Sequence, residues 1–293
     1  MDGIVNVMKP AGMTSHDVVA RLRRIYHTKK VGHTGTLDPD AVGVLPVCVG
    51  QATRLVEYLT EKDKVYRVLM HFGQETETQD ASGTVTRETD ISPLTRPEFE
   101  QVLQSFIGEQ EQIPPMYSAI KRDGQPLYKL ARQGVQVALE PRRITIWDIK
   151  LLMYNQQSAM LEVHCGKGTY IRTLCQDIGR ACGSSAHLAY LLRIRSGQFD
   201  LAESKTLDQL EAMADPGEAL LGLAEALPEV AAWAVEDARV LHRLANGLAQ
   251  RGPFAAEDEG RLYKVVHPDG YLLAIGHVQE GYFKPDKVFK AVE

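Results

Sequence analysis

A single carboxylate stands in a stiff, turn-rich loop that leads into an apolar run. Asp38 precedes Pro39, which favours extended geometry at the residue before it, and Gly32 and Gly35 permit sharp turns on the other side. The next residues, Val42–Val49, are mostly β-branched or apolar and predict a buried strand. Catalytic groups concentrate on loops held by a rigid scaffold, so we expect Asp38 to do chemistry, although an isolated Asp-Pro step more often only forms a turn.

An arginine in a distant segment needs an anionic partner. One buried helix face is predicted by apolar residues at helical spacing, namely Ile171, Leu174, Cys175, Ile178 and Cys182. Arg172 lies off this stripe and near the helix start, where a cation opposes the helix dipole. We therefore expect an acidic side chain beside Arg172. The preceding Gly-Lys-Gly-Thr run is not a phosphate-binding loop, because Gly168 stands where that motif needs serine or threonine.

The elements that must position these two residues follow from periodicity and capping signals. Strands are expected at 4–8, 64–72, 143–154 and 158–165, the last two as a hairpin. Capping boxes at Thr14 and Thr95 predict two helices, the second ended by Gly108. Residues 204–228 predict a helical, acidic connector. The runs 262–266, 271–278 and 287–292 predict a small β-rich module.

Composition places the chain among ordinary globular proteins. Of its 293 residues 44% are hydrophobic and 24% are charged, and the net charge is −5. The charge is segregated, with acidic stretches at 74–100 and 203–229 and basic excesses at 21–30, 121–143 and 167–195, which can build a phosphate-binding face. No apolar run approaches the roughly 20 residues that span a membrane, and the start lacks a signal-peptide layout, so we expect a cytoplasmic protein. The four cysteines form no CxxC pair and predict no zinc site.

The segment 32–54 closely resembles the catalytic motif of the TruB family of tRNA pseudouridine synthases, from Gly-His-Thr-Gly-Thr-Leu-Asp-Pro to Gly-Gln-Ala-Thr-Arg. Segments 9–16, 64–68, 113–121, 170–172 and 186–197 resemble further motifs of that family. The resemblance implies that Asp38 is the catalytic aspartate and that Arg172 pairs with it. It also implies that Tyr66 packs against the target base and that Leu191, next to Tyr190, forms an apolar wall of the uracil pocket.

Further substrate contacts are expected around this centre. The resemblance implies that His33 contacts the substrate loop, whereas its alternative is a turn histidine bonded to backbone. Arg54 and Lys121, together with Arg142, are expected to contact phosphates. The family more often shows Arg-Arg after the pocket leucine, where this chain has Leu192-Arg193, so one phosphate or structural contact is expected to differ.

The resemblance implies an α+β pseudouridine-synthase fold with a mixed, mainly antiparallel central sheet flanked by helices. A catalytic domain is expected at 1–230, with a basic, thumb-like insertion at about 121–143, and a small PUA-like RNA-binding domain at 231–293. The expected reaction is isomerisation of uridine to pseudouridine in the T loop of tRNA, at position 55 of the tRNA. It involves base flipping and needs no guide RNA, metal or cofactor. The expected partner is tRNA, held by its T stem-loop and by its acceptor stem at the C-terminal domain, and the expected enzyme is a monomer that contacts no membrane.

Three other readings remain. A metal-dependent phosphotransferase could use Asp38 and Asp40, but the buried strand that should run into the first aspartate is missing. A non-catalytic RNA-binding or RNA-folding protein fits the basic segments equally well. A guide-RNA-dependent enzyme of the dyskerin type would act on rRNA, but the chain lacks a lysine-rich tail and carries its own basic insertion.

Overall fold

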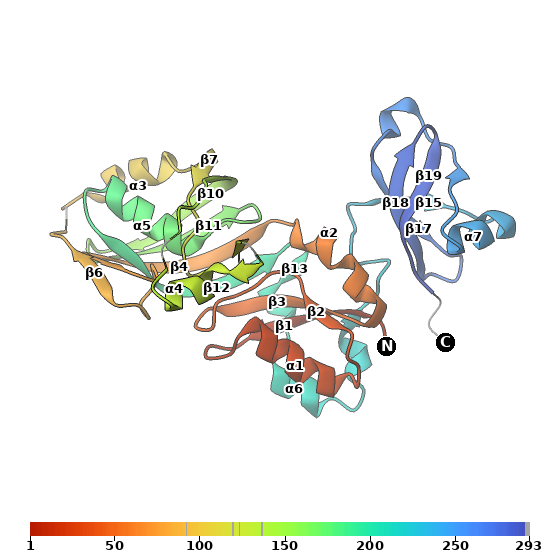
Figure 1. The fold of residues 1–293 in the computed structure, drawn as a ribbon, viewed down its shortest axis with the longest axis horizontal. Helices are drawn as coiled ribbons and strands as arrows, with labels where there is room; N and C mark the ends of the chain where they lie inside the picture. Colours follow the sequence, from red (N-terminus) through yellow and green to blue (C-terminus); the bar gives the residue numbers. More distant parts are fainter. Residues whose placement is uncertain (92, 119, 123, 136, 291–293) are drawn as a thin grey trace.

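A computed structural model describes residues 1–91, 93–118, 120–122, 124–135 and 137–290. Ten strands of the described residues form one large sheet in the order β14-β1-β3-β12-β4-β11-β10-β7, with β2 attached to β3 and β13 to β12 (Figure 1). Their bounds are β1 Gly3–Lys9, β2 Val31–His33, β3 Val42–Val49, β4 Lys64–Phe72, β7 Gly108–Gln112, β10 Arg142–Tyr154, β11 Ser158–Cys165, β12 Ala186–Ser196, β13 Phe199–Asp200 and β14 Leu220–Leu221. The β3–β12 pair is parallel and the other pairs of this sheet are antiparallel, so the predicted mixed, mainly antiparallel sheet is confirmed.

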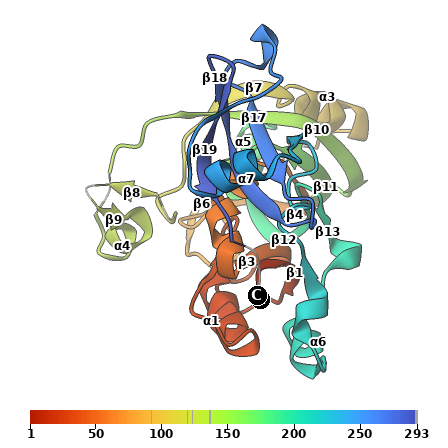
Figure 2. The same cartoon turned by 90° about the vertical axis from the view of Figure 1, so that its right-hand side faces the viewer.

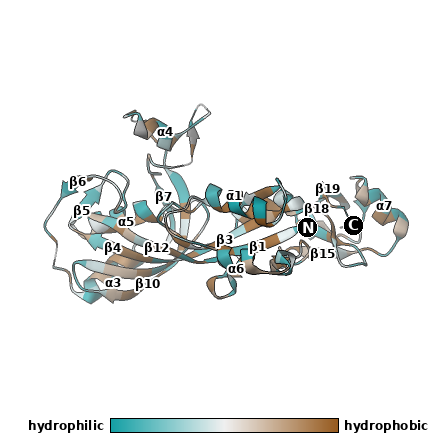
Figure 3. Ribbon diagram, turned by 90° about the horizontal axis from the view of Figure 1, so that it is seen from below, coloured by the Kyte–Doolittle hydropathy of each residue, from teal (hydrophilic) through white to brown (hydrophobic). Residues whose placement is uncertain are grey.

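Helices cover the two halves of this sheet separately. On one half, α1 (Ser15–Ile25) and α6 (Leu207–Ala212) pack against β1 and β3 through a shared apolar cluster. On the other half, α3 (Arg96–Gln104) and α5 (Ile171–Ala181) pack on β4, β10, β11 and β12 (Figure 1). Figure 3 shows the hydrophobic residues gathered in the strands of the sheet between these helices. The apolar stripe of each helix is buried, and α5 also buries the polar side chains of Arg172, Thr173 and Gln176.

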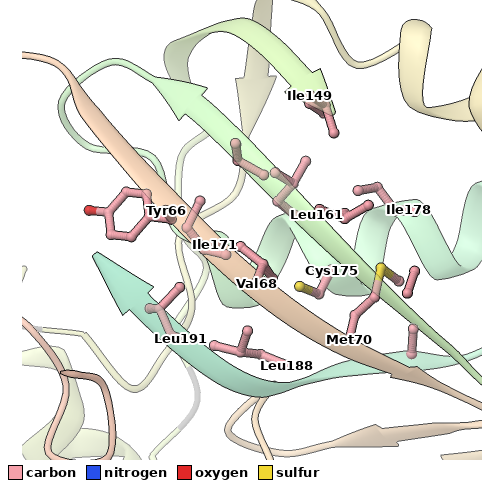
Figure 4. Packing of buried hydrophobic residues seen from close by; sticks show 14 of the residues in the cluster. Tyr66, Val68, Met70, Ile149, Leu161, Ile171, Cys175, Ile178, Leu188 and Leu191 are labelled. Atoms are coloured by element: carbon pink, nitrogen blue, oxygen red, sulfur yellow. The ribbon is translucent and has the colours of Figure 1, made fainter. Parts of the chain in front are cut away.

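Strand β4 shows how alternation builds the core. The side chains of Tyr66, Val68, Met70 and Phe72 are all buried, while Arg67 between them is exposed. In Figure 4 Val68 and Met70 lie among residues of α5 and β11, and Tyr66 lies at one end of this row with its hydroxyl directed away from the cluster. The predicted bounds of this strand are confirmed. Helix α5 begins beside Tyr66. A site can therefore form at this end of the sheet, between the start of the helix and the end of the row of buried side chains.

Two smaller features flank the large sheet. Strands β5 (Gln74–Thr76) and β6 (Val85–Glu88) form a hairpin beside β12. The basic insertion folds as a short hairpin of β8 (Lys121–Arg122) and β9 (Gln125–Pro126) followed by α4 (Leu127–Arg132), and it stands away from the sheet in Figure 2.

The C-terminal part has its own sheet, which confirms the predicted β-rich module. Five strands pair in the order β15-β17-β18-β19-β16. Their bounds, and that of the helix beside them, are β15 Ala231–Ala234, β16 Gln250–Arg251, β17 Leu262–Val266, β18 Leu272–Gln279, β19 Tyr282–Val288 and α7 Ala238–Ala245. Leu272, Ile275 and Phe289 from this part share one apolar cluster with Ile4 and Cys48 of the large sheet.

Three local expectations were wrong. The helix capped at Thr95 ends at Gln104, and Gly108 instead begins strand β7. Residues 204–228 hold only one α-helix, the six residues of α6, together with a short 3-10 turn and the strand β14. The last strand begins at Tyr282 rather than at Lys287, because a register irregularity opposite Ile275 and Gly276 accommodates Pro285 inside it. None of the described helices is long and apolar enough to cross a membrane.

Candidate active site

The loop that carries Asp38 is fastened to the protein on both sides of this residue. Before it, the Ser15 hydroxyl accepts a hydrogen bond from the backbone N–H of Leu37 at 2.9 Å. After it, the buried Lys9 ammonium donates to the backbone carbonyl of Pro39 at 2.9 Å. The loop closes on itself because the backbone N–H of Ala41 donates to the carbonyl of Asp38 at 3.1 Å. The carboxylate is therefore held on a rigid loop, as expected from the sequence.

Arg172 and Asp38 form an ion pair, although 134 positions separate them in the chain. The Nε atom of Arg172 lies 3.0 Å from Oδ2 of Asp38, and Nη2 lies 3.5 Å from Oδ1. The same guanidinium donates to the carbonyls of Tyr117 at 2.7 Å and Thr78 at 3.0 Å. Its side chain is 7% exposed, whereas that of Asp38 is 41% exposed. The fork of the arginine is thus fully used, and one face of the carboxylate stays open.

A second carboxylate touches the far side of this arginine. Asp80 Oδ2 lies 3.5 Å from Nη1 of Arg172, in the turn between β5 and β6. The turn is shaped by Asp80 itself, whose Oδ1 accepts bonds from Thr78 Oγ1 and Ser82 Oγ. The sequence predicts only a turn at this point, because nothing local in an Asp-Ala-Ser-Gly segment reveals a partner 92 positions away.

The protein environment raises the pKa of Asp38 above its ordinary value. Burial is the main cause, and the carboxylates of Asp80 and Asp40 act in the same direction. Arg172 and Lys9 oppose this rise by favouring the charged form. Asp38 is therefore an aspartate whose proton affinity depends on the arginine beside it.

Tyr66 and Leu191 form apolar walls near the carboxylate. Their side chains are 8% exposed each, and both belong to the cluster that contains Leu37, the residue before Asp38. Figure 4 shows Tyr66 and Leu191 on neighbouring strands at the same end of the sheet. Burial raises the pKa of the Tyr66 phenol, so the hydroxyl is neutral and available as a hydrogen-bond donor.

The start of α5 adds a residue that the sequence reading did not select. Tyr170 precedes the helix, and Gln112 on β7 clamps its backbone by donating to its carbonyl at 3.1 Å and accepting from its N–H at 2.8 Å. Burial raises the pKa of Tyr170, the charges of Arg142 and Arg172 oppose this rise, and that of Asp38 adds to it. The sequence offered one indication of this role, because Tyr170 directly precedes Ile171 and Arg172.

The remaining predicted residues are more dispersed. His33 lies on β2 against His16, with ring centroids 6.4 Å apart, and burial lowers the pKa of its imidazole. Tyr190 is 47% exposed, whereas Leu191, its neighbour on β12, is 8% exposed.

The three expected phosphate contacts stay predictions, and the structure describes the side chains of two of these residues. Arg54 donates to the carbonyl of Val288 and lies over the ring of Phe289, 5.3 Å from its centroid, so it joins the large sheet to the C-terminal part. The side chain of Lys121 lies outside the described part of the structure, while that of Arg142 is exposed at the start of β10.

Comparison with known proteins gives the class of this site. One family description, "TruB family pseudouridylate synthase (N terminal domain)", matches residues 23–171, and a second, "tRNA pseudouridylate synthase B C-terminal domain", matches residues 172–223. These matches and the fold identify the class of protein as a pseudouridine synthase. The chain belongs to the TruB family.

Individual relatives agree with this assignment. A tRNA pseudouridine synthase B from Syntrophotalea carbinolica is 46% identical, with 95% of this chain and 92% of the relative covered. The protein of the same name from Symbiobacterium thermophilum is 50% identical over 84% of this chain and 83% of that relative. Among solved structures, an H/ACA ribonucleoprotein bound to a substrate RNA with 2′-deoxyuridine matches with a TM-score of 0.74 and 25% identity, covering 99% of this chain and 85% of that chain. The predicted family, fold and enzyme class are confirmed.

Proposed function

We propose that this chain isomerises one uridine in the T loop of tRNA, at position 55, to pseudouridine, and that it acts as a monomer without guide RNA. The observation that carries the proposal is the Asp38 carboxylate, open on one side, paired with Arg172 on the other and flanked by Tyr66 and Leu191. Its relatives are named as tRNA pseudouridine synthases, which makes tRNA the substrate class. The basic insertion and the C-terminal sheet give the chain its own RNA-gripping surfaces, so no guide RNA has to position the target.

The reaction breaks the N1–C1′ bond of uridine, turns the uracil and joins C5 to C1′. No electrons are gained or lost, so an ionised carboxylate beside the sugar and base suffices as the reactive group. Asp38 either adds to C6 of the uracil or attacks C1′, and both routes begin from the same ionised aspartate. The Arg172 guanidinium keeps this carboxylate charged and aimed.

A uridine in a folded loop reaches the carboxylate only after it flips out of the stack, at a cost of a few kcal/mol. Contact with the Tyr66 ring returns about 1–3 kcal/mol, and Leu191 closes the other side of the base. His33, half-buried beside the catalytic loop, contacts the substrate loop. Lys121, Arg142 and the exposed Tyr190 contribute further RNA contacts. Residues 1–230 make up the catalytic domain in this proposal, and 231–293 the domain that holds the acceptor stem.

The test uses purified protein and unmodified tRNA alone, followed by carbodiimide treatment and primer extension, which stops at pseudouridine. A stop at position 55 in the T loop is expected, and no stop without added guide RNA would favour guide-dependent action like that of H/ACA complexes. Asp38→Asn should abolish the stop while tRNA binding persists. The matched control is Asp40→Asn, two residues away and exposed, which should leave the product unchanged. Conversion by Asp38→Asn would show that another residue is the catalyst.

A further inference from the structure

A fully buried arginine lies on β12, two residues after Leu191, and forms no ion pair with a carboxylate of the described residues. Arg193 on β12 is 1% exposed and is the largest fully buried side chain of the described residues. The ion pairs within the described part of the chain include none that involves Arg193. A buried charge without a counter-charge is expensive, so it persists only where its hydrogen bonds are complete and its position is useful.

The partners of this guanidinium come from the elements that build the pocket. Nε donates to the carbonyl of Val44 on β3 at 2.6 Å, and Nη2 donates to the carbonyl of Gly35 in the catalytic loop at 3.1 Å. Tyr66 on β4 is the cross-strand neighbour of Arg193, so the two side chains share one face of the sheet, and the nearby guanidinium opposes the rise that burial causes in the pKa of the Tyr66 phenol. One side chain therefore joins β3 to the loop that carries Asp38, beside Tyr66.

The backbone is shaped to admit this arginine. Strand β12 runs parallel to β3 with Arg193 opposite Gly43, and a Cβ atom on Gly43 would lie 2.2 Å from the carbonyl oxygen of Arg193. Gly43 also has a φ of +107°, which favours glycine. Close approach of the two strands is what brings the guanidinium within reach of both Val44 and Gly35.

We propose that Arg193 is a positioning residue for pseudouridine formation, which fixes the Tyr66 hydroxyl and the Asp38 loop in one geometry. A guanidinium carries only donors and a positive charge, so beside it the phenol oxygen faces Arg193 and the phenol proton faces away from it. Tyr66 thereby presents a defined donor to the base. Lysine cannot replace this arrangement, because an ammonium is a point charge without the planar fork that reaches the carbonyls of Val44 and Gly35 at once. This inference rests on the proposed function.

The experiment compares Arg193→Lys with Arg195→Lys under single-turnover conditions on unmodified tRNA. Arg195 is the matched control, since it lies on the same strand with a 34% exposed side chain and pairs with Asp63. A misplacement of about 1 Å costs about 100-fold in rate, so Arg193→Lys should lose roughly that factor in kcat while KM for tRNA stays unchanged. Arg195→Lys should retain the wild-type rate. Failure of wild-type protein to modify tRNA would count against the proposed function rather than against this inference.

A double-mutant cycle with Tyr66→Phe separates positioning from mere stabilisation of the fold. If Arg193 acts through the Tyr66 hydroxyl, the Arg193→Lys effect should shrink when the hydroxyl is already absent. Free guanidinium ion at sub-denaturing concentration should partly restore the rate of Arg193→Ala, because it can occupy the vacated space. A wild-type rate for Arg193→Lys would overturn the inference. Effects that simply add in the cycle, or a KM that rises as kcat falls, would overturn it as well.

Discussion

Replacing Arg172 by lysine isolates what the arginine fork contributes to Asp38. The fork reaches both carboxylate oxygens, at 3.0 and 3.5 Å, and simultaneously the carbonyls of Tyr117 and Thr78. A lysine ammonium keeps the charge but cannot occupy these four directions at once. The substitution therefore leaves the net charge of the cleft unchanged and removes the geometry.

The size of the effect follows from two losses. One charge-assisted hydrogen bond to Asp38 is worth about 2 kcal/mol, the lower part of the usual range, because the carboxylate is 41% exposed and partly screened. That amount corresponds to about 30-fold in rate. Misalignment of the Asp38 carboxylate with the substrate lowers the rate by about another 100-fold. Together we expect Arg172→Lys to lower the rate of the chemical step by about three orders of magnitude.

Tritium release from tRNA labelled at C5 of uridine, under single-turnover conditions, measures this step directly, because C5 loses its hydrogen when it joins C1′. The matched control is Arg180→Lys on the same helix, whose partner is Glu75 at 2.8 Å and whose side chain is 52% exposed. Affinity for tRNA should not change, because Arg172 is 7% exposed inside the cleft. A rate within tenfold of wild type, or a loss that appears in binding instead, would refute the reasoning.

Two further predictions concern pH and backbone strain. Asp80→Asn removes a carboxylate that raises the pKa of Asp38, so the acid limb of the rate profile, where the required ionised form is lost, should move to lower pH. An unmoved limb would contradict this origin of the shift. Gly43→Ala should cost about 3 kcal/mol or more of stability in thermal unfolding, because its φ is +107° and a Cβ atom would meet the carbonyl of Arg193. Gly12→Ala, with a φ of +80° and open space around it, should cost less.

The strands near the site were predictable because the local order of apolar and polar residues marks each of them. Strands β3 and β4 have the predicted bounds, since continuous β-branched residues mark a fully buried strand and strict alternation marks one buried face. The helix face of α5 was likewise predictable, and so was the need of Arg172 for an acid. Identifying that acid as Asp38 required the family resemblance, because no periodicity joins residues 134 positions apart.

The elements that were predicted wrongly depend on pairing with distant strands. Residues 220–221 add to β1 as a short strand, although their surroundings read as a helical connector. The predicted run 287–292 omitted residues 282–286, which belong to β19, where Pro285 lies at a register irregularity beyond the short stretch that pairs with β16. Asp80 was missed for the same reason, since its importance comes entirely from Arg172 on another element. Tertiary context decided each of these positions.

Two buried cations beside the catalytic loop are held by backbone carbonyls rather than by carboxylates. Lys9 binds the carbonyls of Pro10, Met13 and Pro39, and Arg193 binds that of Gly35, so backbone dipoles on both sides of Asp38 satisfy them. An acidic partner for either cation would have raised the pKa of Asp38 by like-charge repulsion. Carbonyl oxygens hold the cations without that penalty, although burial lowers the pKa of Lys9 to about 8. Lys9 thus still favours the charged form of Asp38, which is the anion that the reaction needs.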